Sequence, residues 1–184
     1  MKQIPIQLTP IQKEMLDNGA SYVIDVIDIE KLVNGKPFAI SIHDFTKDEI
    51  YRFLDYKIGD EIFFQEKFLE VENNNILYAY DVWSSSTSMY DIRKIDIYKP
   101  SEHMTYEQSR YKYKILDIEI VRVQDIGVEY FTEIYPKDDL YWVSTDYKDK
   151  LDDFKDNFNQ LMQQQNKTAR YEDDILISLI KIKE

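Results

Sequence analysis

The densest group of basic side chains in this sequence lies between His103 and Lys114. Arg110 and Lys112 stand two residues apart, and Ser109 precedes the arginine. An arginine offers a planar fork of donors and a lysine a compact charge, so the pair suits contact with a phosphate group or a nucleobase edge. A solvated strand face, or a structural salt bridge of Arg110, would explain the same pattern. The candidate ligand-binding residues here are His103, Ser109, Arg110 and Lys112.

Glu66 is a candidate for acid–base chemistry. It follows the aromatic pair Phe63-Phe64, and a carboxyl group buried beside aromatic rings has a raised pKa. Pairing with an arginine, or simple exposure, is the structural alternative. Glu66 is therefore a candidate catalytic residue, and its role depends on its surroundings in the fold.

Aromatic side chains could stack on a nucleobase, as exposed rings do in single-strand binders. Trp83 is the first candidate, with Tyr90 and Trp142 beside it, and core packing is the alternative for each. The histidines, His43 and His103, lack the spacing of a metal site. With four glycines in the chain, no glycine-rich phosphate loop is expected. The sequence predicts neither a metal ion nor a cofactor.

Composition limits the class of protein. The chain has 184 residues, no cysteine and a net charge of −12, so we expect a single domain over residues 1–184 in a reducing, cytoplasmic setting. No apolar run is long enough to cross a bilayer, so no membrane association is expected. The negative charge argues against general affinity for nucleic acid, although a local basic face remains compatible with it.

Acidic residues are dense between residues 138 and 156. The default interpretation is the solvated face of a helix. The alternative is a phosphate mimic that occupies a basic groove of another protein, which would use the four carboxylates Asp149, Asp152, Asp153 and Asp156.

Helix signals occur at four places. Two of them are capping boxes, in which a threonine is followed three residues later by a residue that can bond back to it. These are Thr9 with Gln12, where Pro10 also favours a helix start, and Thr46 with Glu49. The first should end at Gly19 and bury Ile11, Met15 and Leu16. The second should place Ile50, Phe53 and Leu54 on one face. Further helices are expected over 128–135, ended by Pro136, and over 146–163.

Strand signals occupy much of the remainder. Runs at 22–29 and 38–42 flank a turn at 34–37, and runs at 61–68 and 76–83 form a predicted hairpin. A polar loop is expected at 84–88 and a strand at 93–98. From Tyr111 to Ile120 apolar and polar residues alternate, with one phase change at Ile115-Leu116 that predicts a β-bulge. The apolar run 175–182 predicts a central closing strand.

Four stretches together resemble phage-encoded proteins of the ASCH group, which are small barrels of the PUA-like superfold. They are KQIPIQLTPIQKEMLDNG, KIGDEIFFQEKF, KPSEHMTYEQSRYKYKILDIEIVRVQDI and the final β-run. The third is the most specific, because it combines Lys-Pro-Ser, His-Met, Ser-Arg, a long strand and Gln-Asp-Ile in this order. The resemblance implies an α+β fold: a small PUA-like mixed β-barrel with short flanking helices and an inserted amphipathic helix at about 146–163.

The resemblance also implies a function. ASCH-like proteins are associated with RNA or modified-nucleobase recognition, and some relatives are amidohydrolases that act on N4-acetylcytidine-type substrates. Those relatives use a lysine and a threonine just after the first helix and a glutamate after the long strand. Here no lysine stands in Gly19-Ala20-Ser21-Tyr22-Val23, whereas Glu129 or Glu133 could supply the glutamate.

We therefore expect a non-catalytic binding module for RNA, single-stranded nucleic acid or a modified nucleobase. Binding of a host protein by an acidic phage protein is one alternative. A residual amidohydrolase, with Glu66 or Glu129 as candidate catalytic residues, is the other.

Overall fold

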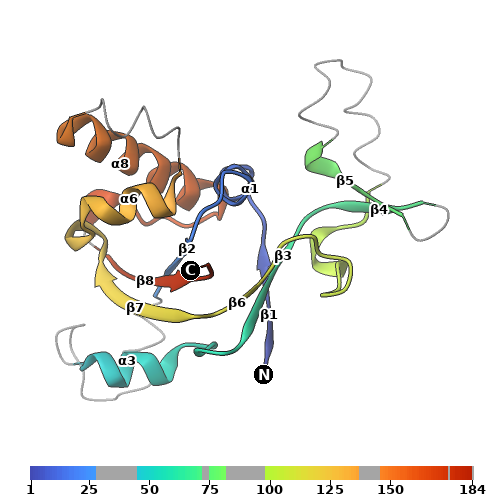
Figure 1. Cartoon of the computed structure of the whole chain (residues 1–184), viewed down its shortest axis with the longest axis horizontal. Helices are drawn as coiled ribbons and strands as arrows, with labels where there is room; N and C mark the ends of the chain where they lie inside the picture. Colours follow the sequence, from blue (N-terminus) through green and yellow to red (C-terminus); the bar gives the residue numbers. More distant parts are fainter. Residues whose placement is uncertain (28–44, 72–74, 82–97, 137–145, 174, 184) are drawn as a thin grey trace.

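A computed structural model describes residues 1–27, 45–71, 75–81, 98–136, 146–173 and 175–183 (Figure 1). The features expected at 34–37, 38–42 and 84–88 lie outside these ranges, as does nearly all of the strand expected at 93–98. Four candidate residues also lie outside them: His43, Trp83, Tyr90 and Trp142.

Helix α1 (Pro10–Asp17) begins at the predicted cap. The Thr9 side chain accepts a hydrogen bond from the backbone N–H of Gln12 at 3.3 Å, and the Gln12 side chain accepts one from the backbone N–H of Thr9 at 3.0 Å. This reciprocal capping satisfies donors that a helix start leaves free. Gly19 follows the helix with a φ of 92°, a conformation that favours glycine. The predicted stripe of Ile11, Met15 and Leu16 is buried.

Helix α3 (Lys47–Phe53) is capped in the same way. Thr46 accepts a hydrogen bond from the backbone N–H of Glu49, and the Glu49 carboxylate accepts one from the backbone N–H of Thr46. Of the residues expected on one face, Ile50 is buried and Leu54 packs beside it. Phe53 is 36% exposed, and its ring centroid lies 6.3 Å from that of Phe45. Phe53 is the last residue of this helix of about two turns.

One three-stranded sheet has the order β1-β3-β6. Strand β1 (Gln3–Gln7) runs parallel to β3 (Glu61–Gln65), and β3 runs antiparallel to β6 (Lys112–Lys114). The predicted start of β3 after Gly59-Asp60 is confirmed. Its residues Ile62, Phe63 and Phe64 are all buried, so β3 is the central strand of this sheet.

The second three-stranded sheet has the order β2-β8-β7. Strands β2 (Tyr22–Val26) and β7 (Asp117–Arg122) both pair antiparallel with β8 (Leu176–Lys181). Residues 177–180 of β8 are completely buried, which confirms the prediction of a central closing strand. Asp25 of β2 lies opposite Ser178 of β8, and this polar pair becomes important below.

The phase change predicted at Ile115-Leu116 is the point where the chain passes from one sheet to the other. The Ile115 backbone N–H donates to the Asp60 carbonyl oxygen at 2.8 Å, in the first sheet. The Leu116 backbone N–H donates to the Lys181 carbonyl oxygen at 2.9 Å, in the second. Strands that switch sheets at a bend form the corners of such folds. The predicted position of the bend is confirmed, but in place of one bulged strand the chain forms two, β6 and β7, in different sheets.

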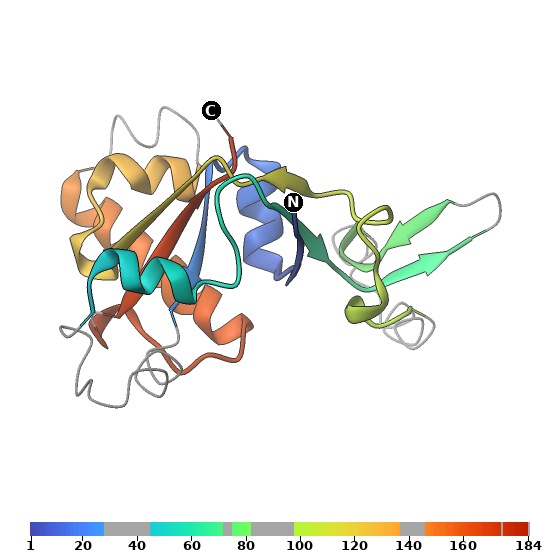
Figure 2. The same cartoon turned by 90° about the horizontal axis from the view of Figure 1, so that it is seen from below.

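Beyond β3 the chain forms an arm that extends away from the two sheets (Figure 2). Strand β4 (Phe68–Glu70) pairs antiparallel with β5 (Ile76–Tyr78). The predicted hairpin of 61–68 with 76–83 is therefore correct only at its tip, because residues 61–65 pair with β1 and β6 instead. Lys99 anchors the arm by a hydrogen bond from its backbone N–H to the Phe68 carbonyl oxygen at 2.7 Å.

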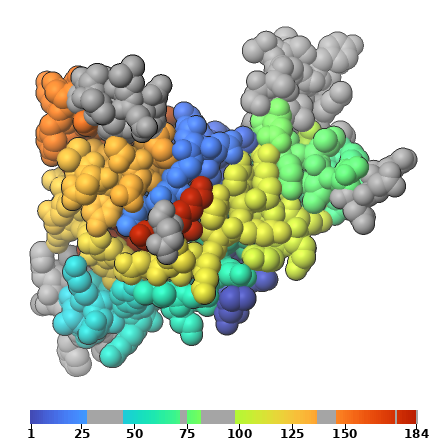
Figure 3. All heavy atoms as spheres, viewed as in Figure 1, coloured from blue at the N-terminus to red at the C-terminus, as the bar shows by residue number. Residues whose placement is uncertain are grey.

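Helices cover both faces of the second sheet. Helices α1, α6 (Val128–Ile134) and α8 (Tyr147–Gln164) lie on one side, and α3 lies on the other (Figure 1). The expected helices at 128–135 and 146–163 are thus confirmed to within a residue at each end. In the space-filling view, α1, α6 and the β6–β7 segment surround the end of β8 (Figure 3). Short 3-10 helices occur at Ser101–His103, Val123–Asp125 and Tyr171–Asp173.

The architecture is α+β, as expected. The strands within the described ranges form open sheets of three, three and two strands, not the closed barrel that the ASCH resemblance implies. No helix in those ranges is long and apolar enough to cross a membrane.

Candidate functional site

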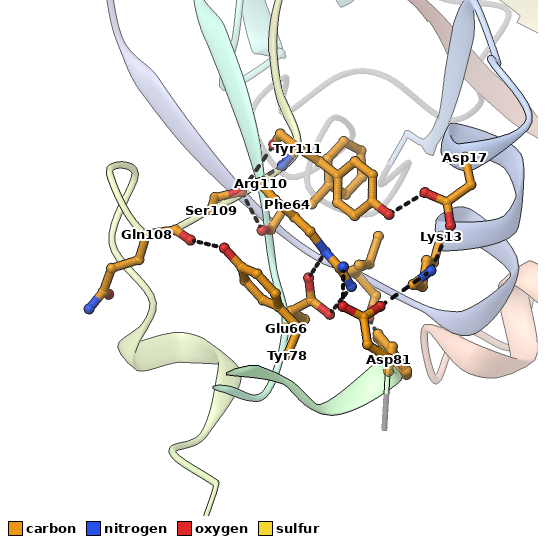
Figure 4. Close-up of polar contacts among 12 residues, drawn as sticks. Lys13, Asp17, Phe64, Glu66, Tyr78, Asp81, Gln108, Ser109, Arg110 and Tyr111 are labelled. Carbon is orange, nitrogen blue, oxygen red and sulfur yellow. Dashed lines mark hydrogen bonds and ion pairs between the residues drawn. The ribbon is translucent and has the colours of Figure 1, made fainter. Parts of the chain in front are cut away.

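Arg110 is the centre of a charged cluster at the base of the arm (Figure 4). Its Nε and Nη2 donate to the two carboxylate oxygens of Glu66, at 2.7 and 2.9 Å, and its Nη1 donates to Asp81 at 2.6 Å. The guanidinium carbon lies 4.3 Å from the ring centroid of Tyr78 and 5.1 Å from that of Tyr111. Arg110 therefore forms a structural salt bridge, which was one of the explanations that the sequence left open.

The Glu66 carboxylate is 1% exposed. Burial raises its pKa, while the Arg110 guanidinium opposes that rise. Burial works against the charged form of Arg110 too, but its two carboxylate partners raise the pKa of the guanidinium above its ordinary value. Both Glu66 oxygens accept hydrogen bonds from Arg110, so the carboxylate acts as the counterion of that arginine.

The cluster continues onto helix α1. Lys13 Nζ donates to Asp17 at 2.6 Å and lies 3.8 Å from Asp81, and the Tyr111 hydroxyl donates to the other Asp17 oxygen. Burial opposes the effect, but the hydrogen bonds from Lys13 and Tyr111 lower the pKa of Asp17. The network therefore joins α1, the segment after β5 and the segment before β6 (Figure 4).

Ser109 is buried and braces the backbone beside this cluster. Its hydroxyl donates to the Phe64 carbonyl oxygen at 2.8 Å and accepts a hydrogen bond from the Tyr111 backbone N–H at 3.3 Å. A hydroxyl bonded on both sides to main chain positions a strand. Ser109 thus connects Phe64 of β3 to the start of β6.

The other candidates do not gather around Arg110. Lys112 Nζ donates to the Glu107 carbonyl oxygen at 2.9 Å and lies 5.0 Å from the ring centroid of Tyr106. His103 is exposed at the end of its 3-10 helix, and Glu129 is exposed on α6. Within the described ranges no three potential metal ligands lie together.

Sequence reasoning missed a pocket of about 330 Å³ between the two sheets, which we call the inter-sheet pocket. Strand β1, strands β2 and β8, residues 55–56 and the end of α8 enclose it. Its walls are mainly apolar, from Ile4, Pro5, Ile6, Ile24 and Ile180, and its polar lining includes Asp25, Tyr56, Gln165 and Lys167. Small-molecule sites typically measure about 300–1,000 Å³ and combine apolar walls with a few convergent polar groups.

A hydrogen-bonded network lies at the polar side of this pocket. The Tyr56 hydroxyl donates to one Asp25 oxygen at 2.9 Å and lies 2.5 Å from the Ser178 hydroxyl. Lys167 Nζ donates to the other Asp25 oxygen at 3.3 Å. Burial, followed by the charge of Asp25, raises the pKa of Tyr56, so its hydroxyl stays protonated and acts as a donor.

Gln165 supplies an unused acceptor. Its Oε1 is buried and has no hydrogen-bond partner in the described part of the chain. A buried polar atom without a partner costs about 1–3 kcal/mol. The neighbouring Gln164 is already engaged, because its Oε1 accepts a hydrogen bond from the Ile11 backbone N–H at 3.1 Å.

Asn166 sets the position of Lys167 at the end of α8. It has a φ of 56°, and the Lys167 backbone N–H then donates to the Met162 carbonyl oxygen at 2.9 Å. We expect Asn166→Val to lower the free energy of unfolding by about 1–2 kcal/mol, because a left-handed backbone crowds a β-branched side chain. Asn166→Gly should change it by only a few tenths of a kcal/mol. Urea denaturation checks both, and equal stability of the two variants would contradict the assignment.

One sequence signal pointed toward the pocket. In the β2 run the residues Val23 and Ile27 are buried, and Asp25 shares their face by strand alternation. A carboxylate on an otherwise apolar strand face requires a partner. The partner, Lys167, is 142 positions away, and no local pattern identifies it.

Comparison with known proteins assigns no family. The chain matches no protein-family model, no curated protein and no solved structure. The function must therefore be argued from the geometry of this chain, and the ASCH resemblance remains an expectation.

Proposed function

We propose that this protein is a non-catalytic binding module whose ligand contains a nucleobase. The ligand is a modified base, an RNA or another single-stranded nucleic acid. The observation that carries the proposal is the inter-sheet pocket. Its isoleucine walls suit the faces of a planar ring, and Asp25, Gln165 and Lys167 offer acceptors and a donor for the polar edge of a base. The Tyr56 hydroxyl donates its proton to Asp25 and so fixes the orientation of that carboxylate beside the pocket.

The proposal places the ligand in the pocket rather than at Arg110. Three N–H groups of Arg110 are committed to carboxylates, and a phosphate would have to displace Glu66 to bind there. At the pocket, by contrast, the Gln165 Oε1 has no hydrogen-bond partner within the described ranges. A ligand gains more where it satisfies an orphaned group than where it breaks an existing pair.

A PUA-like fold of the ASCH type is part of the proposal. It is supported by the motif segments at 2–19, 57–68 and 99–126 and by the strand that passes between the two sheets at Ile115-Leu116. Lys167 beside Asp25 supports, as the second candidate, a residual amidohydrolase. That lysine comes from the end of α8 rather than from the segment after α1.

The host-protein alternative rests on α8. Asp149, Asp152 and Asp156 are exposed on this helix, and Lys155 lies 3.5 Å from Asp152. A surface helix ordinarily exposes charged residues of both signs on its outer face. The acidic face is thus accounted for by solvation, and we assign it no ligand.

Calorimetric titration of the whole protein with cytidine, N4-acetylcytidine and adenosine tests the proposal. We expect at least one nucleoside to bind, and Asp25→Asn to weaken that binding by about tenfold, because a hydrogen bond to a charged group contributes about 1.5–3 kcal/mol. Lys167→Ala should weaken it similarly. The matched control is Lys155→Ala, which removes a lysine from the same C-terminal part of the chain but outside the pocket and should leave affinity unchanged.

Absence of binding by any of the three nucleosides and by short single-stranded RNA at low salt would reject the proposal. Binding that neither Asp25→Asn nor Lys167→Ala affects would place the ligand elsewhere and also contradict it. Release of acetate from N4-acetylcytidine, abolished by Lys167→Ala, would identify the amidohydrolase candidate instead.

A further inference from the structure

A second hollow adjoins the inter-sheet pocket. It measures about 430 Å³, and Asp55 and Tyr56 line both cavities. The two cavities are therefore adjacent at residues 55–56.

Three basic side chains line the second hollow, Lys2, Arg52 and Lys57, and we call it the basic hollow. Arg52 and Lys57 are exposed, and neither side chain forms an ion pair with any residue in the ranges that the structure describes. The Lys2 Nζ donates to the Asp55 carbonyl oxygen at 2.6 Å, which holds this lysine against the wall shared with the pocket.

Main-chain donors hold the carboxylate of Asp60 in this hollow in its charged form. It is buried and accepts hydrogen bonds from the backbone N–H groups of Lys2 at 2.8 Å and Lys57 at 3.2 Å. The hydrogen bond from Lys2, stronger than the opposing effect of burial, lowers the pKa of Asp60. Asp60 therefore fixes the backbone of both lysines, and three basic groups face two carboxylates in a chain whose net charge is −12.

We infer that the basic hollow is a phosphate subsite of the ligand site, so that the ligand is a nucleotide with its base in the inter-sheet pocket and its phosphate beside Arg52 and Lys57. This inference rests on the proposed function. Arg52 and Lys57 form no ion pair within the described ranges, and guanidinium and ammonium groups are the ones that recognise phosphate oxygens. The shared wall at Asp55 and Tyr56 makes the two subsites neighbours.

The phosphate could belong to a free mononucleotide or to the backbone of a single strand. Both present the same oxygens to the hollow, and they differ in charge and in length. A mononucleotide, a trinucleotide and the parent nucleoside therefore distinguish the sources, with inorganic phosphate as a probe of the hollow alone.

The test compares adenosine, adenosine 5′-monophosphate, cytidine, cytidine 5′-monophosphate, the trinucleotides of each base and inorganic phosphate by titration at low salt. We expect a phosphorylated ligand to bind about tenfold more tightly than its nucleoside, an advantage that falls as salt rises. Arg52→Ala with Lys57→Ala should abolish the advantage and leave nucleoside affinity unchanged. The matched control is Lys47→Ala, which removes an exposed lysine of α3 outside the hollow.

The outcomes separate this inference from the proposed function. Nucleosides that bind as tightly as every phosphorylated form would overturn the phosphate subsite and leave the base pocket standing. No binding of any probe would overturn both. An advantage of the trinucleotide but not of the mononucleotide would support the subsite with a strand backbone as its source. An advantage that survives the double substitution would place the phosphate elsewhere and reject the inference.

Discussion

Replacing Arg110 with methionine is expected to lower the free energy of unfolding by about 3–5 kcal/mol. The substitution keeps an unbranched apolar stem but leaves the Glu66 carboxylate, 1% exposed, without its bidentate partner. Breaking one side of a buried ion pair is costly because the remaining charge has neither water nor a counterion. Guanidinium chloride denaturation at neutral pH measures the loss.

The same variant should show a characteristic pH dependence. Without Arg110, the pKa of Glu66, which burial already raises, should rise further. A carboxyl group whose folded-state pKa lies above its ordinary value of 4.5 contributes its stability below that value and loses it as pH rises through the folded-state pKa. The deficit relative to the wild type should therefore shrink as the pH falls from neutral toward 4.5.

Two controls bear on the interpretation. Lys112→Met removes a half-exposed cation two residues away and should change stability by less than about 0.5 kcal/mol. Glu66→Leu combined with Arg110→Met should recover most of the loss, since replacing both partners of a buried pair with apolar groups is often close to neutral. A single variant as stable as the wild type, at every pH tested, would contradict a buried ion pair at this position.

Replacing Phe154 with alanine is expected to lower the free energy of unfolding by about 3–5 kcal/mol. This side chain of α8 is 1% exposed and stacks on Phe131 of α6 with ring centroids 4.3 Å apart. It also meets the edges of Tyr135 and Tyr171 at 5.6 and 6.2 Å. Its removal would leave a cavity among rings that cannot close together around it.

Tyr147→Ala is the matched control on the same helix, because Tyr147 is 61% exposed. It should change stability by less than about 0.5 kcal/mol. A loss below about 1 kcal/mol for Phe154→Ala would show that α8 is a loosely attached insertion. The expected loss would instead make α8 part of the core on which the sheet β2-β8-β7 depends.

Local structure was predictable wherever neighbours in the chain decide it. The capping boxes at Thr9 and Thr46 lie within one helical turn, so their residue types alone determine the helix starts. The spacing of apolar residues in α8 and the continuous apolar run of β8 also reflect local periodicity. The phase change at Ile115-Leu116 located a corner for the same reason, although the pattern did not show which strands lie on either side of it.

Strand pairing was less predictable, because hydrogen bonds between strands depend on segments distant in the chain. The run at 61–68 was expected to form one strand of a hairpin, and instead it divides after Gln65. Its first part lies between β1 and β6, and its second part forms the arm. The alternation of residues is compatible with either arrangement.

The sequence by itself determined the α+β character, the helix limits, the central strand β8 and the corner after β6, because each depends on residues a few positions apart. Only the tertiary structure decided the chemistry. It joined Arg110 to Glu66 across 44 positions and Lys167 to Asp25 across 142, which changed the role of the first pair and created the polar side of the inter-sheet pocket. Contacts between residues so far apart in the chain arise when whole helices and strands pack together, and such packing produces no periodic pattern in the sequence.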